Sequence, residues 1–193
     1  MTENENRQPR DRVRVALWAG AGLVLFGVAL LLFGPRRGTQ ELPPADLAAD
    51  ASGGVHTTTL FFAARDGTRL VPEQRDLVSR TGLDQWCAAA IRALVEGPRE
   101  GDVVRTLPAA TSLHRVYYDK DAATVYLDFA PSLLTEHPGG TTAEWATLGC
   151  IVKTIGANFP EIARVQILVD QQPVESLAGH FDISSPIEIA TWQ

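Results

Sequence analysis

The sequence predicts an α+β fold, a single small domain preceded by a transmembrane helix. After the first 56 residues, short segments rich in β-branched and aromatic residues alternate with two longer segments whose apolar residues repeat at helical spacing. Their order is two strands, a helix, two strands, a second helix and two strands. We therefore expect one domain over residues 57–187, with about six short strands and two helices packed on one face of the sheet. Residues 188–193 are expected to form a C-terminal tail.

The first element is an apolar run over residues 15–34, which contains no charged side chain. A helix of that length spans the hydrocarbon core of a bilayer, which is about 30 Å thick. The run is longer than a signal-peptide core, and the Pro-Arg-Arg that follows it does not resemble a cleavage site. Four arginines precede the run and two follow it closely. This bias predicts a single-pass protein of the inner or cytoplasmic membrane, with tail 1–14 inside and the domain outside.

Residues 35–56 are rich in proline, alanine, glycine and aspartate and contain no aromatic residue, which is typical of a flexible linker. Of the 17 basic and 23 acidic residues, 6 and 3 lie at or before Arg37, so 11 and 20 follow it and the net charge there is −9. That charge argues against binding to nucleic acid or to an anionic bilayer surface. A solvated acidic surface that only keeps the domain soluble explains the same balance.

The domain is predicted to open with a hairpin and a helix. Residues 57–63 (TTTLFFA) predict a strand, and an Asp-Gly turn leads to a second strand over residues 70–78. Because Pro72 cannot donate a ladder hydrogen bond, we expect the second strand to be at an edge of the sheet, irregular or short. An exposed edge is a candidate docking surface. A capping-box pattern at residues 81–84 starts the first helix, and a Gly-Pro pair ends it.

A second hairpin is predicted over residues 113–118 and 123–129. In its second strand Val125, Leu127 and Phe129 alternate with polar or aromatic residues, so one face is buried.

The last predicted elements are a helix and two strands. A capping box with Thr141 and Glu144 starts the second helix, which ends before Pro160. Residues 165–169 (VQILV) predict a strand, and a short strand over residues 174–177 follows a turn.

Several motifs occur together in an order that resembles a known family. They are the Asp66-Gly67 turn, Leu70-Val71-Pro72-Glu73, Leu94-Val95-Glu96-Gly97-Pro98, Leu107-Pro108, residues 124–129 (TVYLDF) and residues 167–180 (ILVDQQPVESLAGH). The combination resembles the GerMN domain of sporulation and spore germination proteins and of related bacterial cell-envelope proteins. The resemblance covers most of the chain after the linker.

The resemblance implies a small α+β domain similar to the ring-building modules of secretion and sporulation assemblies. Members of the family are usually lipoproteins or membrane-anchored, and some are thought to bind other envelope proteins. The partners that it implies are therefore other cell-envelope proteins or a second copy of this chain. No lipobox cysteine follows the apolar run, and one copy of the domain is present, so we expect a protein anchor and no tandem role.

A search for catalytic and metal-binding motifs is negative, and we predict no enzymatic activity, metal or cofactor. The histidines lack the spacing of a metal site; they are His56, His114, His137 and His180. The Gly139-Gly140 pair before the second helix fits a turn better than an anion site.

Carboxylate pairs are the remaining catalytic option, because a glycan hydrolase needs two acids that flank its substrate. Asp128 with Glu144, or Glu96 with Glu175, are the candidate pairs, although surface acids and helix caps explain these residues without catalysis.

Cys87 and Cys150 are the only cysteines, one on each predicted helix. Outside the membrane the compartment permits oxidation, so a disulfide between them is one interpretation. It would close a separation of 63 residues and add roughly 4 kcal/mol. The alternative is two buried thiols that pack as small apolar groups.

Trp86, Trp145 and Asp128 form the candidate interaction surface. Both tryptophans lie beside the apolar faces of their helices, and exposed tryptophans are frequent interface hot spots, although packing at the edge of the core is the alternative.

The sequence leads to two hypotheses of function. The first is a membrane-tethered, non-catalytic module that docks envelope proteins, which the resemblance and the edge strand favour. The second is a domain that binds or trims peptidoglycan, which a cleft holding Asp128 and a tryptophan would favour.

Overall fold

The computed structural model describes residues 54–79, 81–99 and 101–192. The predicted membrane span at 15–34, the tail at 1–14 and most of the predicted linker lie outside these residues. In the described ranges, no helix is both long enough and apolar enough to cross a bilayer.

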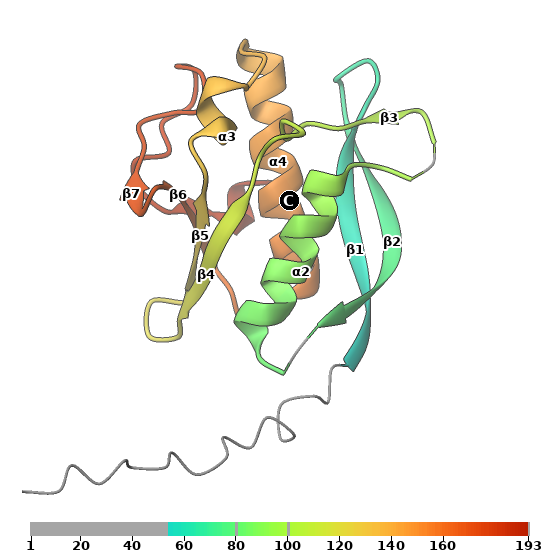
Figure 1. The fold of residues 1–193 in the computed structure, drawn as a ribbon, viewed down its shortest axis with the longest axis vertical. Helices are drawn as coiled ribbons and strands as arrows, with labels where there is room; N and C mark the ends of the chain where they lie inside the picture. The colour runs from blue at the N-terminus through green and yellow to red at the C-terminus, as the bar shows by residue number, and fades with distance from the viewer. Residues whose placement is uncertain (1–53, 80, 100, 193) are drawn as a thin grey trace, which may run out of the picture. The chain divides into compact units, whose positions relative to one another are not determined.

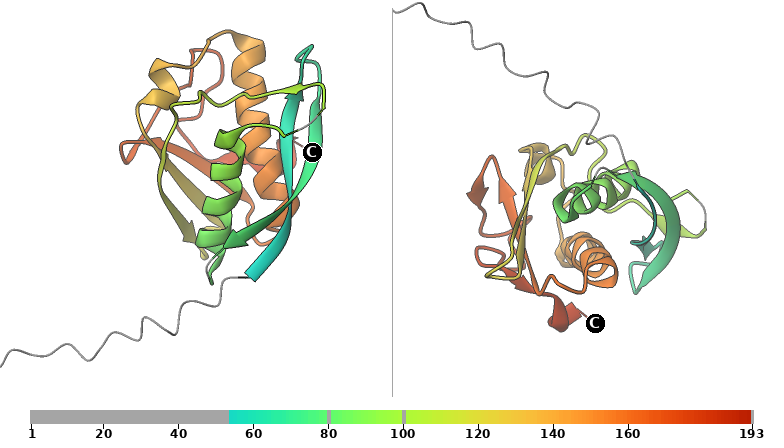
Figure 2. Two further views of the ribbon diagram at one scale, coloured as in Figure 1. Left: turned by 45° about the vertical axis from the view of Figure 1, so that its right-hand side comes forward. Right: turned by 90° about the horizontal axis from the view of Figure 1, so that it is seen from below.

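The domain has three layers, with two helices between two sheets (Figures 1 and 2). The first sheet has the order β2-β1-β3 and the second β4-β5-β6-β7, with β8 also paired to β6. The strands are β1 (Gly54–Ala64), β2 (Leu70–Ser79), β3 (Val103–Val104), β4 (Leu113–Asp119), β5 (Thr124–Phe129), β6 (Arg164–Val169), β7 (Gln172–Pro173) and β8 (Ile187–Glu188). The helices are α2 (Leu83–Glu96), α3 (Ser132–Thr135), α4 (Thr141–Asn158) and the 3₁₀ helix η1 (Ile189–Trp192).

The α+β class and the succession of hairpins and helices are confirmed, but the arrangement of one sheet with both helices on one face is wrong. The main helices instead contact a sheet on each side, because α4 buries small and weakly polar residues as well as its apolar stripe. The predicted strand at 174–177 is a loop. β1 begins at Gly54, inside the predicted linker, and β8 and η1 extend through the predicted tail.

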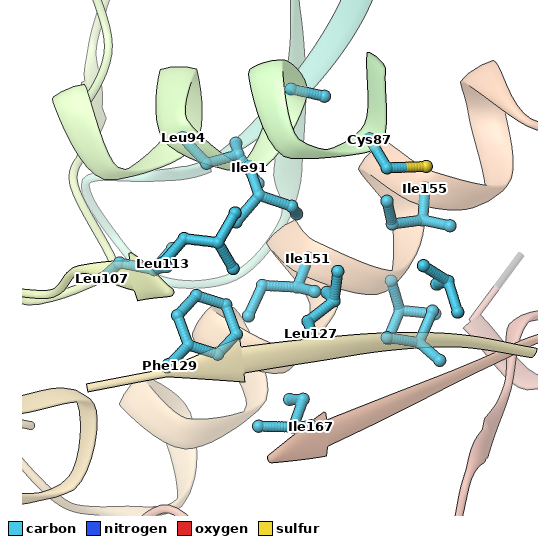
Figure 3. Packing of buried hydrophobic residues seen from close by; sticks show 14 of the residues in the cluster. Cys87, Ile91, Leu94, Leu107, Leu113, Leu127, Phe129, Ile151, Ile155 and Ile167 are labelled. Carbon is cyan, nitrogen blue, oxygen red and sulfur yellow. The ribbon is translucent and has the colours of Figure 1, made fainter. Parts of the chain in front are cut away.

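The core fills the space between the two sheets (Figure 3). α2 contributes Ile91 and Leu94, α4 contributes Ile151 and Ile155, and β5 contributes Leu127 together with other alternate residues. All five are at most 1% exposed. Burial of one such side chain contributes about 2 kcal/mol, so the predicted period-2 and helical patterns account for most of the core.

Two glycines let neighbouring segments approach α4 closely. A Cβ atom at Gly149 would lie 2.7 Å from Leu70 Cδ1, and one at Gly156 would lie 2.5 Å from Ile189 Cγ2. Since real Cβ atoms do not come so close, only glycine allows β2 and η1 to pack on this face of the helix.

Helix α4 also closes one edge of the first sheet. The N–H of Thr59 donates to Asn158 Oδ1 (2.9 Å), Asn158 Nδ2 donates back to the Thr59 carbonyl (2.8 Å), and the N–H of Phe61 donates to Thr154 Oγ1 (3.0 Å). Side chains of a helix therefore satisfy backbone groups that would otherwise pair with another strand.

These bonds fix which way the backbone of β2 faces. Thr59 and Phe61 direct their N–H groups away from β2, so their partners in the register, Gln74 and Pro72, direct their backbone groups away from β1. Pro72 is tolerated because its nitrogen points outward. Of the three alternatives, an edge strand is confirmed, and β2 pairs regularly with β1 over ten residues.

Arg75 of β2 holds the C-terminal end of α2. Its side chain is 1% exposed, and it donates to the carbonyls of Ala93 (3.2 Å) and Gly97 (2.6 Å) while Nε pairs with Glu73. A cation at this position satisfies carbonyls that the helix leaves unpaired and complements its dipole.

Replacement of Arg75 by Met should destabilise the domain by about 3 kcal/mol, because it leaves buried helix carbonyls and Glu73 without their partner. Chemical denaturation of the full chain measures this. Arg92→Met on the exposed side of α2 is the matched control and should change the unfolding free energy by less than about 0.5 kcal/mol. Equal effects of the two variants would contradict the assigned role.

Candidate functional site

A groove of about 490 Å³ lies over the exposed side of α4. Residues from the β1–β2 turn, α4, the loop after β7 and η1 line it; they are Thr68, Arg69, Leu70, Trp145, Lys153, Phe181, Thr191 and Trp192. A second hollow of about 300 Å³ shares Lys153 and Trp192 with it and adds Phe61 and Ile189. The two hollows therefore share part of their wall.

Two tryptophans form the aromatic part of this tryptophan groove. The rings of Trp145 and Trp192 are nearly parallel, with an interplanar angle of 28° and centroids 6.2 Å apart. That separation corresponds to an offset stack, in which each ring leaves part of its face uncovered. Trp192 belongs to η1, and its ring packs on α4 where Gly149 leaves room for it.

Two cations complete the tryptophan groove. Lys153 Nζ donates to the Trp192 carbonyl (3.0 Å) and lies 5.6 Å from the centroid of the Phe61 ring, so it is held in place. Arg69 is exposed at the start of β2. The lining of both hollows contains no aspartate or glutamate. The arrangement is suited to binding an anionic group beside an aromatic surface, and its lining offers no carboxylate for acid–base chemistry.

Asp128 lies elsewhere, on the outer face of the second sheet. It is 6% exposed and lines a hollow of about 290 Å³ together with Tyr117 and Tyr126. Its Oδ1 accepts the N–H of Gln171 (2.8 Å), which belongs to the β6–β7 turn, where Asp170 and Gln171 have φ of 47° and 67°. Asp128 therefore stabilises a turn in which non-glycine residues adopt left-handed conformations.

Trp86 packs at the edge of the core. Its Nε1 donates to Thr58 Oγ1 (3.0 Å), its ring stacks on His56 with centroids 4.4 Å apart, and it meets Phe159 edge to face. Among the three residues of the candidate surface, Trp145 alone lies in the tryptophan groove. The structure does not bring Trp86, Trp145 and Asp128 into one site.

The disulfide interpretation of Cys87 and Cys150 is not met, because both residues are free and buried. Burial raises the pKa of Cys150 to about 12 and raises that of Cys87 as well. Both therefore remain protonated and pack as small apolar groups.

Glu144 is a fully buried acid, whereas the sequence pattern predicts that it caps the second helix. It does not cap α4, where Gly140 is the N-cap and receives no side-chain bond. Its carboxylate is fully buried and accepts the N–H groups of Leu177 (3.0 Å), His180 (3.0 Å) and Phe181 (3.4 Å). His180 Nδ1 lies 3.2 Å from the same carboxylate.

The environment of Glu144 keeps it ionised. Burial by itself would raise its pKa, but the backbone N–H groups of the loop at 177–181 lower it, and the net shift is downward. One buried carboxylate thereby fixes the loop that carries Phe181 into the tryptophan groove. A buried Glu144 also cannot pair with Asp128 around a substrate as a hydrolase would require.

The segment before α4 forms a turn. The N–H of Gly139 donates to His137 Nδ1 (3.1 Å), so His137 Nε2 carries the proton and donates to Thr147 Oγ1 (3.0 Å), whose hydroxyl donates to the Thr106 carbonyl (3.0 Å). Burial lowers the pKa of His137, which favours this neutral form. In the described part of the chain, no group of three or more His, Cys, Asp or Glu residues could hold a metal ion.

A family model described as "Germane: Sporulation and spore germination" matches residues 59–175. The chain belongs to this family. The match includes both main helices and the start of the loop after β7, while β8 and η1 lie beyond the matched residues.

Solved structures agree with the Germane fold. A protein from Clostridium perfringens, described as a candidate lipoprotein, is 30% identical with a TM-score of 0.51, over 70% of this chain and 88% of that one. The first GerMN domain of the sporulation protein GerM from Bacillus subtilis is 18% identical (TM-score 0.56, 69% and 97% covered). The tandem GerMN domains of GerM are 20% identical (TM-score 0.53), and here the chain covers 44% of that structure. No curated protein matches the chain.

The Glu144 carboxylate should make the stability of this Germane domain depend on pH. Its folded-state pKa is lowered from 4.5, so its contribution is complete above the unfolded-state pKa and is lost as the pH falls through the folded-state value. Glu144→Gln should cost about 2 kcal/mol at pH 7. The difference from the wild type should shrink below about pH 4.5.

Denaturation of both proteins across this pH range measures the effect. Glu136→Gln, at an exposed position before α4, is the control. It should leave the dependence of the unfolding free energy on pH unchanged. If the loss of unfolding free energy in Glu144→Gln stays equally large at low pH, the role of the ionised carboxylate is contradicted.

Proposed function

We propose that this protein is a membrane-anchored component of the cell envelope whose Germane domain is a non-catalytic protein-interaction module outside the membrane. Membership of the family supports the envelope role, as does the similarity to a candidate lipoprotein. The apolar run at residues 15–34 and its flanking arginines support a single-pass anchor with the N-terminus inside.

The observation that carries this proposal is the open edge of β2. On the other side of the hairpin, Thr154 and Asn158 cover the edge of β1. β2 is the end strand of the first sheet, and within the described ranges no strand pairs with the outward backbone groups of Gln74, Asp76 and Val78. These three side chains are exposed. A strand of a partner can add to such an edge through main-chain hydrogen bonds.

The outer face of the β1–β2 hairpin gives this edge an apolar contact point. Val55 and Val78 face each other across the pair and are 68% and 73% exposed. Beside them, Thr57 donates to the Asp76 carboxylate (2.8 Å). We expect a partner strand with an apolar residue over the valines and a basic residue near Asp76.

Gln74→Pro tests this docking directly. The substitution removes an outward N–H without removing a ladder bond to β1, so the domain should stay folded, as it does with Pro72. Gln74→Ala is the matched control, since it keeps the N–H. In-cell crosslinking of the tagged full-length protein, followed by mass spectrometry, should recover envelope proteins with the wild type and Gln74→Ala but not with Gln74→Pro.

A chain without residues 54–193 serves as the background in that experiment. Loss of crosslinks in both Gln74 variants would place the contact on the side chain instead of the strand edge. Crosslinks that survive Gln74→Pro would overturn docking through β2. Crosslinks only between copies of this chain would identify self-association at the edge.

A further inference from the structure

We propose that the tryptophan groove binds an anionic glycan, a saccharide chain that bears carboxylate groups. The site consists of Trp145 and Trp192 as a stacking surface, Arg69 and Lys153 as cations, and the hydroxyls of Thr68 and Thr191. It lies apart from the β2 edge positions Gln74, Asp76 and Val78, and it assigns the domain a ligand in addition to a protein partner.

The charge of the groove is opposite to the net charge of the chain after Arg37. Acidic residues outnumber basic ones by 20 to 11 after Arg37, yet the lining of the groove and its neighbouring hollow contains two cations and no carboxylate. A nearby acid, Asp66, is not part of the lining. Its carboxylate accepts the N–H and hydroxyl of Thr68 and lies within electrostatic reach of Arg69. The electrostatic preference is therefore for an anion.

The groups that line the groove favour a saccharide over an acidic peptide. A peptide that adds to a sheet needs the backbone groups of a strand edge, whereas the groove offers indole faces, hydroxyls and cations of side chains. A pyranose ring has a flat C–H face that packs on an indole, and hydroxyls that pair with Thr68 and Thr191. Its carboxylate can accept two parallel hydrogen bonds from Arg69.

The parts of the groove are held in place before any ligand binds. Lys153 is fixed by the Trp192 carbonyl and by the Phe61 ring. Trp192 rests on α4 at Gly149, where a Cβ atom would lie 2.9 Å from its ring. Phe181 belongs to the loop that Glu144 fixes. A preformed site loses little conformational entropy on binding.

Binding of the purified full-length protein in detergent micelles to defined glycans tests the proposal. The probes are peptidoglycan glycan strands freed of their stem peptides, whose lactyl groups are then free carboxylates, together with polygalacturonate oligosaccharides, chitin oligosaccharides as a neutral glycan, and poly-glutamate as an acidic peptide. We expect binding to at least one of the acidic glycans, little binding to chitin oligosaccharides, and weaker binding at higher salt. Binding to the peptide-free glycan strands alone would indicate peptidoglycan as the source, and binding to polygalacturonate alone would indicate another acidic polysaccharide.

Four variants locate the site. Trp192→Ala and Arg69→Gln should each weaken binding by about tenfold. Tyr117→Ala and Lys120→Gln are the matched controls, an exposed aromatic residue and an exposed cation of the second sheet and its turn, and should not change the affinity. Arg69 is exposed and its charge acts on Asp66 only at longer range, so Arg69→Gln tests the site even if Trp192→Ala loosens η1.

Three results would overturn the proposal: no binding to either acidic glycan, binding that both groove variants leave intact, or binding to poly-glutamate alone. Glycan binding by the purified protein depends neither on the β2 edge nor on export of the domain. Its failure therefore leaves docking through β2 standing, and loss of docking in Gln74→Pro leaves the glycan site standing.

Discussion

Helix α4 is buried on most of its sides, and the rest of the domain depends on the contacts that this burial fixes. Its apolar residues fill the space between the two sheets, while four polar residues hold three different segments. Glu144 fixes the loop at 177–181, Thr147 the segment at Thr106, and Thr154 and Asn158 the edge of β1. Because a buried polar group is costly without a partner, these bonds determine one arrangement of the chain.

This arrangement also explains where the domain can bind. The side chains that α4 directs to β1 close one edge of the first sheet and leave the other edge, on β2, for a partner. On its exposed side α4 carries Trp145 and Lys153, and its glycines admit η1 with Trp192. The proposed docking edge and the proposed glycan groove thus both follow from the position of one helix.

The sequence predicts much of this fold because most elements are locally encoded. Alternation in residues 124–129 and the apolar stripe of α2 place those elements correctly, and Pro72 correctly indicates an edge. The sequence does not reveal that α4 is buried on more than one side. Ala146, Thr147 and Thr154 are buried in the structure without being strongly apolar. Periodicity alone therefore suggests one covered face where there are two.

The binding residues are less predictable, because they come from distant parts of the chain. Trp145 is recognisable as a candidate, but its stacking partner lies in η1, a segment that looks like a tail. Glu144 matches a capping box at the level of local spacing, and only tertiary structure turns its carboxylate to the loop at 177–181. The roles of these residues depend on contacts between segments far apart in the chain, and no local sequence pattern reveals those contacts.

Amide hydrogen exchange by NMR on the full-length protein in micelles tests the central claim, the difference between the two edges of the first sheet. The account predicts slow exchange for the amides of Thr59 and Phe61, which α4 covers, and fast exchange for Gln74 and Val78 on the open edge. Protection of Gln74 and Val78 as strong as that of Thr59 and Phe61 would contradict it, because the edge of β2 would then be closed within the chain itself.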